Sequence, residues 1–178
     1  SVLEISSRSE DPNGVALSAF NLTLATLLGP TPVECVYQAS KVFERGGPFT
    51  ELMNRKPADA RADERLKTSG SLIGFKYGAD WWGLEPKTCF YDWLYLNALK
   101  ANAVLAECVI SADGFTDIAF NPQKSVSCQA RSAAIYTLFA RTNLLGKAMT
   151  SQRDFVFEHG QAIRTHSIGS ERSLFSAD

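Results

Sequence analysis

The chain has 178 residues, enough for one domain with a sizeable hydrophobic core over residues 1–178. Hydrophobic residues make up 45% of it and charged residues 21%, the balance of a soluble globular protein, and no apolar run approaches the length of a membrane span. The net charge of −1 excludes a highly charged, non-specific nucleic-acid binder, although it allows a nucleic-acid substrate held by a few local contacts.

The cysteines and histidines restrict the chemistry further. The four cysteines lack metal-ligand spacing and stand among apolar neighbours, so we expect reduced, buried thiols in a cytoplasmic protein. The two histidines, His159 and His166, lie near the C-terminus, where chains often fray. A histidine-based triad or a metal site is therefore not expected, and any catalysis falls to carboxylates, lysines or tyrosines.

Turn signals divide the N-terminal part of the chain. Asp11-Pro12-Asn13-Gly14 and Gly29-Pro30-Thr31-Pro32 both predict turns, with short strands and loops over 15–28. A helix is predicted over 33–44, where Gly46-Gly47-Pro48 ends it.

A second helix is predicted over 57–68, with Pro57 in its first turn. Arg61 and Arg65 are four residues apart on it and share a face, as solvated surface charge or as contacts to DNA phosphates. The glycine-rich segment 69–88 predicts a loop.

The C-terminal half is predicted to be mostly helical. Residues 89–107 are apolar nearly all round, as in a buried central helix. A short strand and an Asn-Pro turn are expected over 114–125, followed by helices near 128–140 and 144–155. The last 20 or so residues carry no clear pattern and are expected to form a loosely packed tail. Because helices dominate with a few short strands, the predicted fold class is α+β.

The predicted helix from residue 33 has an unusual polar side. Glu34, Gln38 and Lys41 fall within an arc of about 60°, with Tyr37 on its flank. This stripe is either a solvated face or the wall of an active site. Glu34 and Lys41 would stand about 10.5 Å apart along the axis, too far to form a simple neighbouring pair. A carboxylate and an amine that face one ligand can supply a base and a nucleophile.

The segment FYDWLYL (90–96) places Asp92 between two aromatic residues. Asp92 either stabilises the helix start and caps a neighbouring loop, or serves a site as a perturbed buried carboxylate. Tyr91 and Trp82 either belong to the core or line a pocket that stacks a base or a ribose.

The loop 120–132 enters a helix with several polar residues. Ser125 and Gln129 are candidate helix caps, and Lys124 and Arg131 are nearby cations. Such a helix start can receive a phosphate or pyrophosphate, or it can simply be well capped.

Several motifs agree with one known family. Glu34, Tyr37, Gln38, Ala39 and Lys41 form the pattern Glu-x-x-Tyr-Gln-Ala-x-Lys, and LSAF at 17–20 precedes it. The blocks KVFERGGPF, SGSLIGF, FYDWLYLNAL, FTDIAFNP and CQARSAA complete the set. Together they resemble the NADAR domains over residues 2–153, in the branch encoded beside DarT-type DNA ADP-ribosyltransferase toxins. Ala19 stands where the family has asparagine.

The resemblance implies an antitoxin that hydrolyses the N-glycosidic bond between ADP-ribose and guanine in DNA, releases ADP-ribose and uses no cofactor. Its partners would be ADP-ribosylated DNA and a DarT-type toxin, and it would not act at a membrane. Two other functions stay open: an N-glycosidase for a small ribosylated metabolite, and a non-catalytic antitoxin that binds ADP-ribose or the toxin.

The resemblance also suggests roles for individual residues. Glu34 would orient water or a ribose hydroxyl, and Lys41 would form a Schiff base with the opened sugar or protonate the leaving amine. Asp92 would be a second carboxylate. The candidate substrate-binding residues are Ser18, Phe20, Tyr37, Gln38, Trp82, Tyr91, Asn121, Ser125, Gln129 and Arg131.

Overall fold

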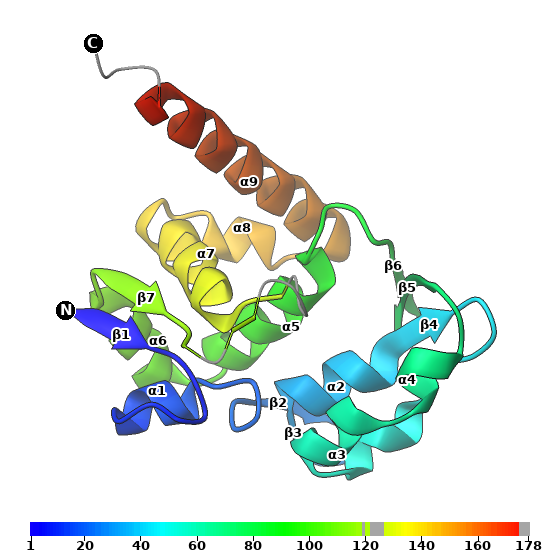
Figure 1. Ribbon diagram of the computed structural model, residues 1–178. Helices are drawn as coiled ribbons and strands as arrows, with labels where there is room; N and C mark the ends of the chain where they lie inside the picture. The colour runs from blue at the N-terminus through cyan, green and yellow to red at the C-terminus, as the bar shows by residue number, and fades with distance from the viewer. Residues whose placement is uncertain (119, 122–126, 175–178) are drawn as a thin grey trace.

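The computed structural model describes residues 1–118, 120–121 and 127–174, and it has the predicted α+β class (Figure 1). In this described part, helices surround a central helix, and the strands form small sheets of two or three strands. No helix within these ranges is both long enough and apolar enough to span a membrane.

The predicted helix over 89–107 is two helices, α5 (Cys89–Lys100) and α6 (Ala103–Ser111). The prediction of one continuous helix was wrong because Asn102 caps α6: its side chain accepts a hydrogen bond from the backbone of Leu105 at 3.2 Å. Helix α5 is buried on almost every side and packs against α2, α6, α7 and α9. The predicted helix near 128–140 is confirmed as α7 (Gln129–Arg141).

The helix predicted over 33–44 ends earlier, as α2 (Val33–Ser40), and the chain continues as strand β4 (Lys41–Phe43). Lys41 is already extended, with φ −63° and ψ 132°. The β-branched and aromatic residues that follow pair with β5 (Leu72–Tyr77), and this pairing overrides the helical pattern.

Helix α2 separates two hydrophobic clusters. Val33 and Val36 face the main core, whereas Cys35 and Ala39 face a second cluster that includes Leu52. This leaves the strip with Glu34 and Gln38 for the cavity described below.

The segment predicted as a loop over 69–88 contains a hairpin of β5 and β6 (Asp80–Trp82). Gly74 and Gly78 belong to this hairpin. Gly78 adopts φ +59° in the turn. A Cβ atom at Gly74 would lie 2.4 Å from the Trp81 ring, so this position needs glycine for close packing.

The predicted helix over 57–68 is also interrupted. It forms α3 (Pro57–Ala62) and α4 (Arg65–Thr68), preceded by the 3-10 helix η1 (Thr50–Asn54). Asp63 leaves the helical conformation, with φ −56° and ψ 127°, and its carboxylate accepts a hydrogen bond from the Arg65 backbone at 3.0 Å. This side-chain-to-backbone bond competes with the helix and explains the break.

Near the N-terminus, both predicted turns were wrong. Asp11 caps the short helix α1 (Pro12–Ala16), whose Pro12 occupies the first turn. Gly29–Pro32 is strand β3, which pairs with β2 (Thr23–Thr26). Strand β1 (Val2–Glu4) pairs in parallel with β7 (Gly114–Thr116), which confirms the short strand expected there.

The C-terminal segment is helical where the sequence shows no clear pattern. The predicted helix near 144–155 is divided between α8 (Leu145–Ala148) and α9 (Gln152–Leu174). Phe155 and His159 of α9 are fully buried, so the first turns of this helix pack on the body of the protein.

All four cysteines are free thiols, and burial raises the pKa of Cys35 to about 11.

Candidate functional site

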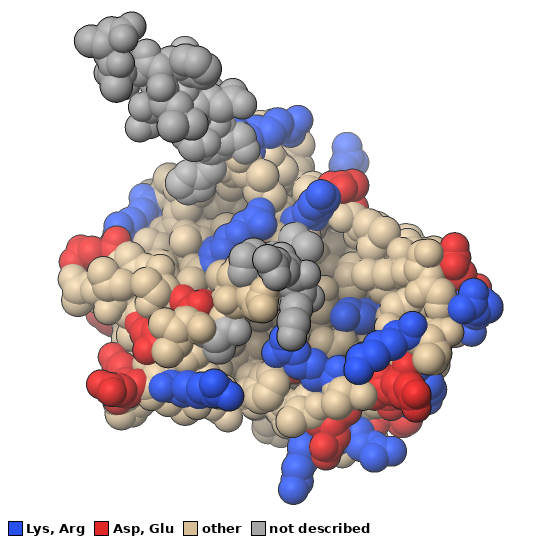
Figure 2. Space-filling model, viewed as in Figure 1, with Lys and Arg blue, Asp and Glu red and all other residues tan. Residues whose placement is uncertain are grey.

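A cavity of about 750 Å³ opens beside α2, a size typical of small-molecule sites. Figure 2 shows Lys and Arg side chains gathered around a hollow on this face of the molecule. The cavity brings together these sequence-predicted site residues: Ser18, Phe20, Glu34, Tyr37, Gln38, Lys41, Tyr91, Asn121 and Gln129. The polar strip of α2 therefore lies in a cavity wall.

Glu34 and Gln38 form the buried part of this wall. Each is only 6% exposed, and Gln38 Nε2 donates a hydrogen bond to Glu34 Oε1 at 2.9 Å. The other amide atom, Gln38 Oε1, is buried without a hydrogen-bond partner among the described residues. Because an unsatisfied buried acceptor is costly, this oxygen suits a donor on a ligand, such as a ribose hydroxyl.

The backbone and a nearby arginine also fix the position of Glu34. It lies in the first turn of α2, where the helix dipole favours a carboxylate. Its backbone N–H donates to Ala19 O at 2.9 Å, which joins α2 to the LSAF segment. Arg61 Nε is 3.9 Å from Glu34 Oε1. The carboxylate thus faces the cavity with one amide donor and one distant cation.

Lys41 lies in the same cavity, at the point where α2 becomes β4. Its Nζ lies 4.8 Å from the centre of the Tyr37 ring. Burial lowers the pKa of Lys41; the Glu34 charge opposes this effect, and the Arg61 charge adds to it. At a given pH, more of the amine is therefore neutral than in an exposed lysine.

Aromatic packing holds Tyr37 in the wall. Its ring stacks on Phe75 at 5.4 Å and meets Tyr91 edge-on at 5.1 Å. Ser127 Oγ lies 3.4 Å from the Tyr37 hydroxyl. Burial raises the pKa of Tyr37 to about 12, so the hydroxyl stays protonated at neutral pH. It can therefore donate a hydrogen bond to a ligand oxygen.

Gln129 joins the loops on the other side of the cavity. Its Oε1 accepts a hydrogen bond from the Ala19 backbone, and its Nε2 donates to Asp117 Oδ2 at 3.1 Å. The LSAF segment is held further by Tyr95, whose hydroxyl donates to Leu17 O at 2.8 Å. Gln129 therefore supports the shape of the cavity by connecting its loops.

Three predicted residues do not line the cavity. Asp92 is fully buried between α5, α7 and α9, and Trp82 is packed in the aromatic core, 5.0 Å from the Trp93 ring. Arg131 lies on α7, outside the lining. Ser125 falls outside the described residues.

The position of Asp92 explains why a polar residue is present in this core. Its carboxylate accepts hydrogen bonds from Thr88 Oγ1 and Ser132 Oγ, both at 2.6 Å, and lies 2.7 Å from His159 Nε2. The carboxylate therefore accepts hydrogen bonds from partners at the start of α5 and on α7 and α9, and it is not part of the cavity lining. The arrangement agrees with the alternative that Asp92 stabilises the fold, here by joining α9 to the core.

We expect Asp92→Ala to lower the free energy of unfolding by about 3 kcal/mol, because it takes the carboxylate partner from the buried His159 ring and removes the hydrogen bonds to Ser132 and Thr88. Urea unfolding followed by circular dichroism measures this effect. Asp80→Ala, at an exposed carboxylate of β6, is the matched control and should change stability by less than about 0.5 kcal/mol. Equal stability of the two variants would contradict the structural role of Asp92.

Some lining residues were not predicted as site residues: Ser7, Ala19, Arg61, Leu66, Lys67, Leu72, Asp117, Phe120 and Ser127. For Arg61 the sequence indicates only solvated surface charge or a contact to DNA phosphates. Nothing local in the sequence places α3 and α4 beside α2, because that contact depends on the second hydrophobic cluster. Among the described residues, no group of three or more His, Cys, Asp or Glu side chains could hold a metal ion.

The fold and the cavity define a small α+β protein with a pocket for a polar ligand. The family model described as "DarT1-associated NADAR antitoxin" matches residues 1–167. Because this match covers nearly the whole chain, the protein belongs to the NADAR family, in its DarT1-associated branch. No curated protein matches the chain.

Proposed function

We propose that this protein is an antitoxin that removes ADP-ribose from guanine bases in DNA by hydrolysing the N-glycosidic bond. The observation that carries the proposal is the meeting of Glu34, Gln38 and Lys41 in one cavity, with the two α2 side chains buried. The description of the family as antitoxins associated with DarT1 supports it, since removal of the modification would undo the action of a DNA ADP-ribosyltransferase.

In the proposed reaction, Glu34 acts as the catalytic carboxylate does in a glycoside hydrolase. The bond joins the guanine amino nitrogen to the anomeric carbon of the ribose, and breaking it develops positive charge on the sugar. The Glu34 carboxylate stabilises that charge and takes a proton from the attacking water. The water oxygen bonds to the anomeric carbon, the electron pair of the broken bond goes to the nitrogen, and a proton restores the amine. The products are ADP-ribose and unmodified guanine.

Lys41 supports this reaction in one of two ways. As a neutral amine it attacks the anomeric carbon of the ring-opened sugar, displaces the guanine amine and forms an imine, which water then hydrolyses. As an ammonium group it donates the proton that the leaving nitrogen needs. The lowered pKa of Lys41 suits either role, since it brings the amine closer to a neutral working pH.

The depth of the cavity predicts a preference for single-stranded DNA. Glu34 and Gln38 lie at 6% exposure, so the sugar bond of a modified guanine reaches them more readily when its base is free to leave the stack. Leaving the stack costs a few kcal/mol in a duplex and little in a single strand. We expect kcat/KM to be about tenfold or more higher on a single-stranded oligonucleotide than on the same strand in a duplex. Equal values would contradict extrusion into this cavity.

The proposal is tested by comparing substrates. The protein is incubated with an oligonucleotide carrying one ADP-ribosylated guanine, and separately with ribosylated purines and pyrimidines, and the released sugar is measured by chromatography. Release of ADP-ribose from the oligonucleotide is expected. Turnover of the small compounds alone would support a metabolite N-glycosidase.

Protection of cells separates catalysis from simple binding. When the protein is expressed with a DarT-type toxin, the Glu34→Ala/Lys41→Ala double variant should lose protection while its Tm stays close to that of the wild type. Full protection by this variant would support a non-catalytic antitoxin that binds ADP-ribose or the toxin.

A further inference from the structure

We propose that Arg61 and Lys67 form a phosphate-binding rim of the cavity, and that Arg65 is a positioning residue that holds this rim in place. This inference rests on the proposed function for its substrate, and it adds how the phosphates of that substrate are recognised.

The cavity has a buried wall and an exposed, positively charged side. Glu34 and Gln38 on α2 are almost completely buried, whereas Arg61 on α3 and Lys67 on α4 line the same cavity and are exposed. A ligand whose reacting sugar reaches Glu34 would therefore extend its remaining groups toward these two cations. Phosphate oxygens are the groups that arginine and lysine bind best.

Arg61 and Lys67 keep donors available for a ligand. The Arg61 contact with Glu34 is long, at 3.9 Å, so it is an ion pair without a direct hydrogen bond at this nitrogen. Within the part of the chain that the structure describes, no carboxylate lies within 4 Å of Lys67 Nζ. Lys67, and the guanidinium donors of Arg61 that this long contact leaves unused, can therefore pair with an incoming anion.

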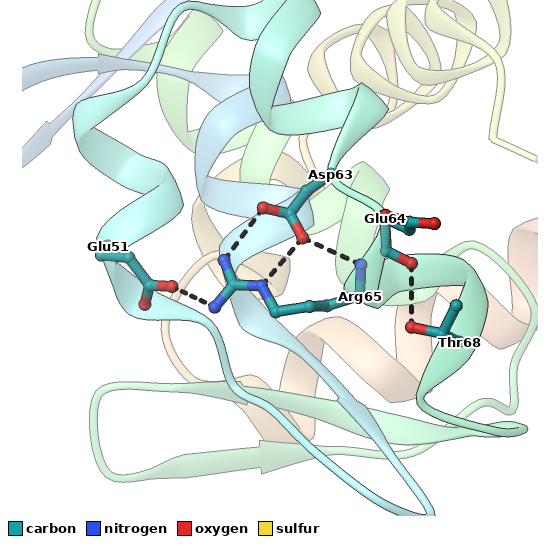
Figure 3. Close-up of polar contacts among 5 residues, drawn as sticks. All are labelled: Glu51, Asp63, Glu64, Arg65 and Thr68. Atoms are coloured by element: carbon teal, nitrogen blue, oxygen red, sulfur yellow. Dashed lines mark hydrogen bonds and ion pairs between the residues drawn. The ribbon is translucent and has the colours of Figure 1, made fainter.

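Arg65 differs from these two cations because its guanidinium group is paired with the carboxylates of Asp63 and Glu51 (Figure 3). Its Nε and Nη2 donate to the two oxygens of Asp63, both at 2.9 Å, and its Nη1 lies 2.6 Å from Glu51 Oε1. Its guanidinium also lies over the Phe49 ring, 4.4 Å from the centre. Hydrogen bonding from Arg65 lowers the pKa of Asp63, and the pKa of Glu51 is lowered first by a hydrogen bond from its own backbone and then by Arg65. Each of its three guanidinium nitrogens already contacts a carboxylate, so Arg65 is not a candidate for direct phosphate contact.

The contacts of Arg65 instead fix the segment that carries the rim. They join η1 to the turn between α3 and α4, where Asp63 interrupts the helix. Leu66, next to Lys67, packs against the second hydrophobic cluster on the back of α2. Arg45 Nη2 donates to Thr68 O at 3.1 Å and holds the end of α4. The rim is thus preorganised relative to the wall with Glu34, which lowers the entropic cost of binding.

The phosphate has two possible sources: the pyrophosphate of ADP-ribose and a phosphodiester of the DNA backbone. Lys67→Ala is the test variant, because Arg61 pairs with the proposed catalytic Glu34, whereas no ion pair joins Lys67 to Glu34 among the described residues. Lys56→Ala, at an exposed lysine outside the cavity, is the matched control. Steady-state kinetics are measured on the modified oligonucleotide at several salt concentrations, and on ADP-ribosylated guanosine without DNA phosphates.

We expect Lys67→Ala to raise KM for the oligonucleotide about tenfold with kcat within twofold of wild type, and Lys56→Ala to change neither. If KM rises only for the oligonucleotide, and the KM of the variant depends less on salt than that of the wild type, Lys67 contacts the DNA backbone. A rise on both substrates assigns the contact to the pyrophosphate. An unchanged KM on both substrates would overturn the phosphate-binding rim.

Arg65 is tested by combining variants. Arg65→Ala should raise KM more than it lowers kcat, Arg65→Lys should restore only part of the loss, and Lys67→Ala should add little in the Arg65→Ala background. A full tenfold effect of Lys67→Ala in that background would overturn the positioning role. Binding of ADP-ribose and inorganic pyrophosphate by calorimetry tests the rim even if the wild type cleaves no modified DNA, so failure of the rim and failure of the hydrolase are distinguishable.

Discussion

Glu34→Gln is expected to lower the single-turnover rate of ADP-ribose release by about 10³-fold, within the range of general acid–base contributions. Glutamine keeps the shape of the side chain and its contact with Gln38, but it cannot accept a proton from water or stabilise positive charge on the sugar. Binding of ADP-ribose should stay within a few-fold of wild type, because the cavity is unchanged. Rapid mixing with excess enzyme measures the chemical step.

The control for this prediction is Glu107→Gln, the same change at an exposed position on α6. It should leave the rate unchanged. If Glu34→Gln releases ADP-ribose within a few-fold of the wild-type rate, then Glu34 is not the carboxylate of the reaction, even though it lies in the cavity.

Lys41→Ala is expected to lower the same rate by about 10²–10⁴-fold, whether the amine acts as a nucleophile or as a proton donor. Lys76→Ala, at an exposed lysine of β5, is the matched control and should have no effect. A rate for Lys41→Ala close to wild type would remove Lys41 from the mechanism.

The pH dependence separates the two roles of Lys41. Burial lowers its pKa from 10.5, so the titration falls below the range of an exposed lysine. For a nucleophile, the reactive form is neutral, and the rate should rise with pH and level off above the lowered pKa. For a proton donor, the reactive form is charged, and the rate should fall as pH rises through the same value. Borohydride should trap a covalent adduct on Lys41 only in the first case.

The polar strip of α2 could be predicted from the sequence because helical periodicity is local. Glu34 and Gln38 are one turn apart, so any helix through them places both on one face. The end of that helix could not be predicted in the same way. Lys41 becomes extended because Val42 and Phe43 pair with β5, a contact with residues about 30 positions away. Even so, Lys41 reaches the cavity from the strand.

The parts of the site that the sequence did not reveal depend on tertiary contacts. Asp92 is a carboxylate between aromatic residues, a pattern that can indicate a site. Its partners Ser132 and His159 come from two other helices and contact its carboxylate in the core. The sequence leaves Arg61 open between surface charge and a phosphate contact and does not single out Lys67; the packing of α3 and α4 against the back of α2 brings both residues to the cavity. In each case, contacts with residues far along the chain determine where the side chain lies.

The most direct test of the central claim is mass spectrometry of a guanine-ADP-ribosylated oligonucleotide after incubation with wild type and with Lys41→Ala. The proposed hydrolase predicts that wild type returns the oligonucleotide to its unmodified mass and that Lys41→Ala leaves the ADP-ribose in place. A modified mass that persists with the wild type would contradict DNA hydrolase activity. Loss of ADP-ribose with both proteins would contradict the role of Lys41 in the cavity.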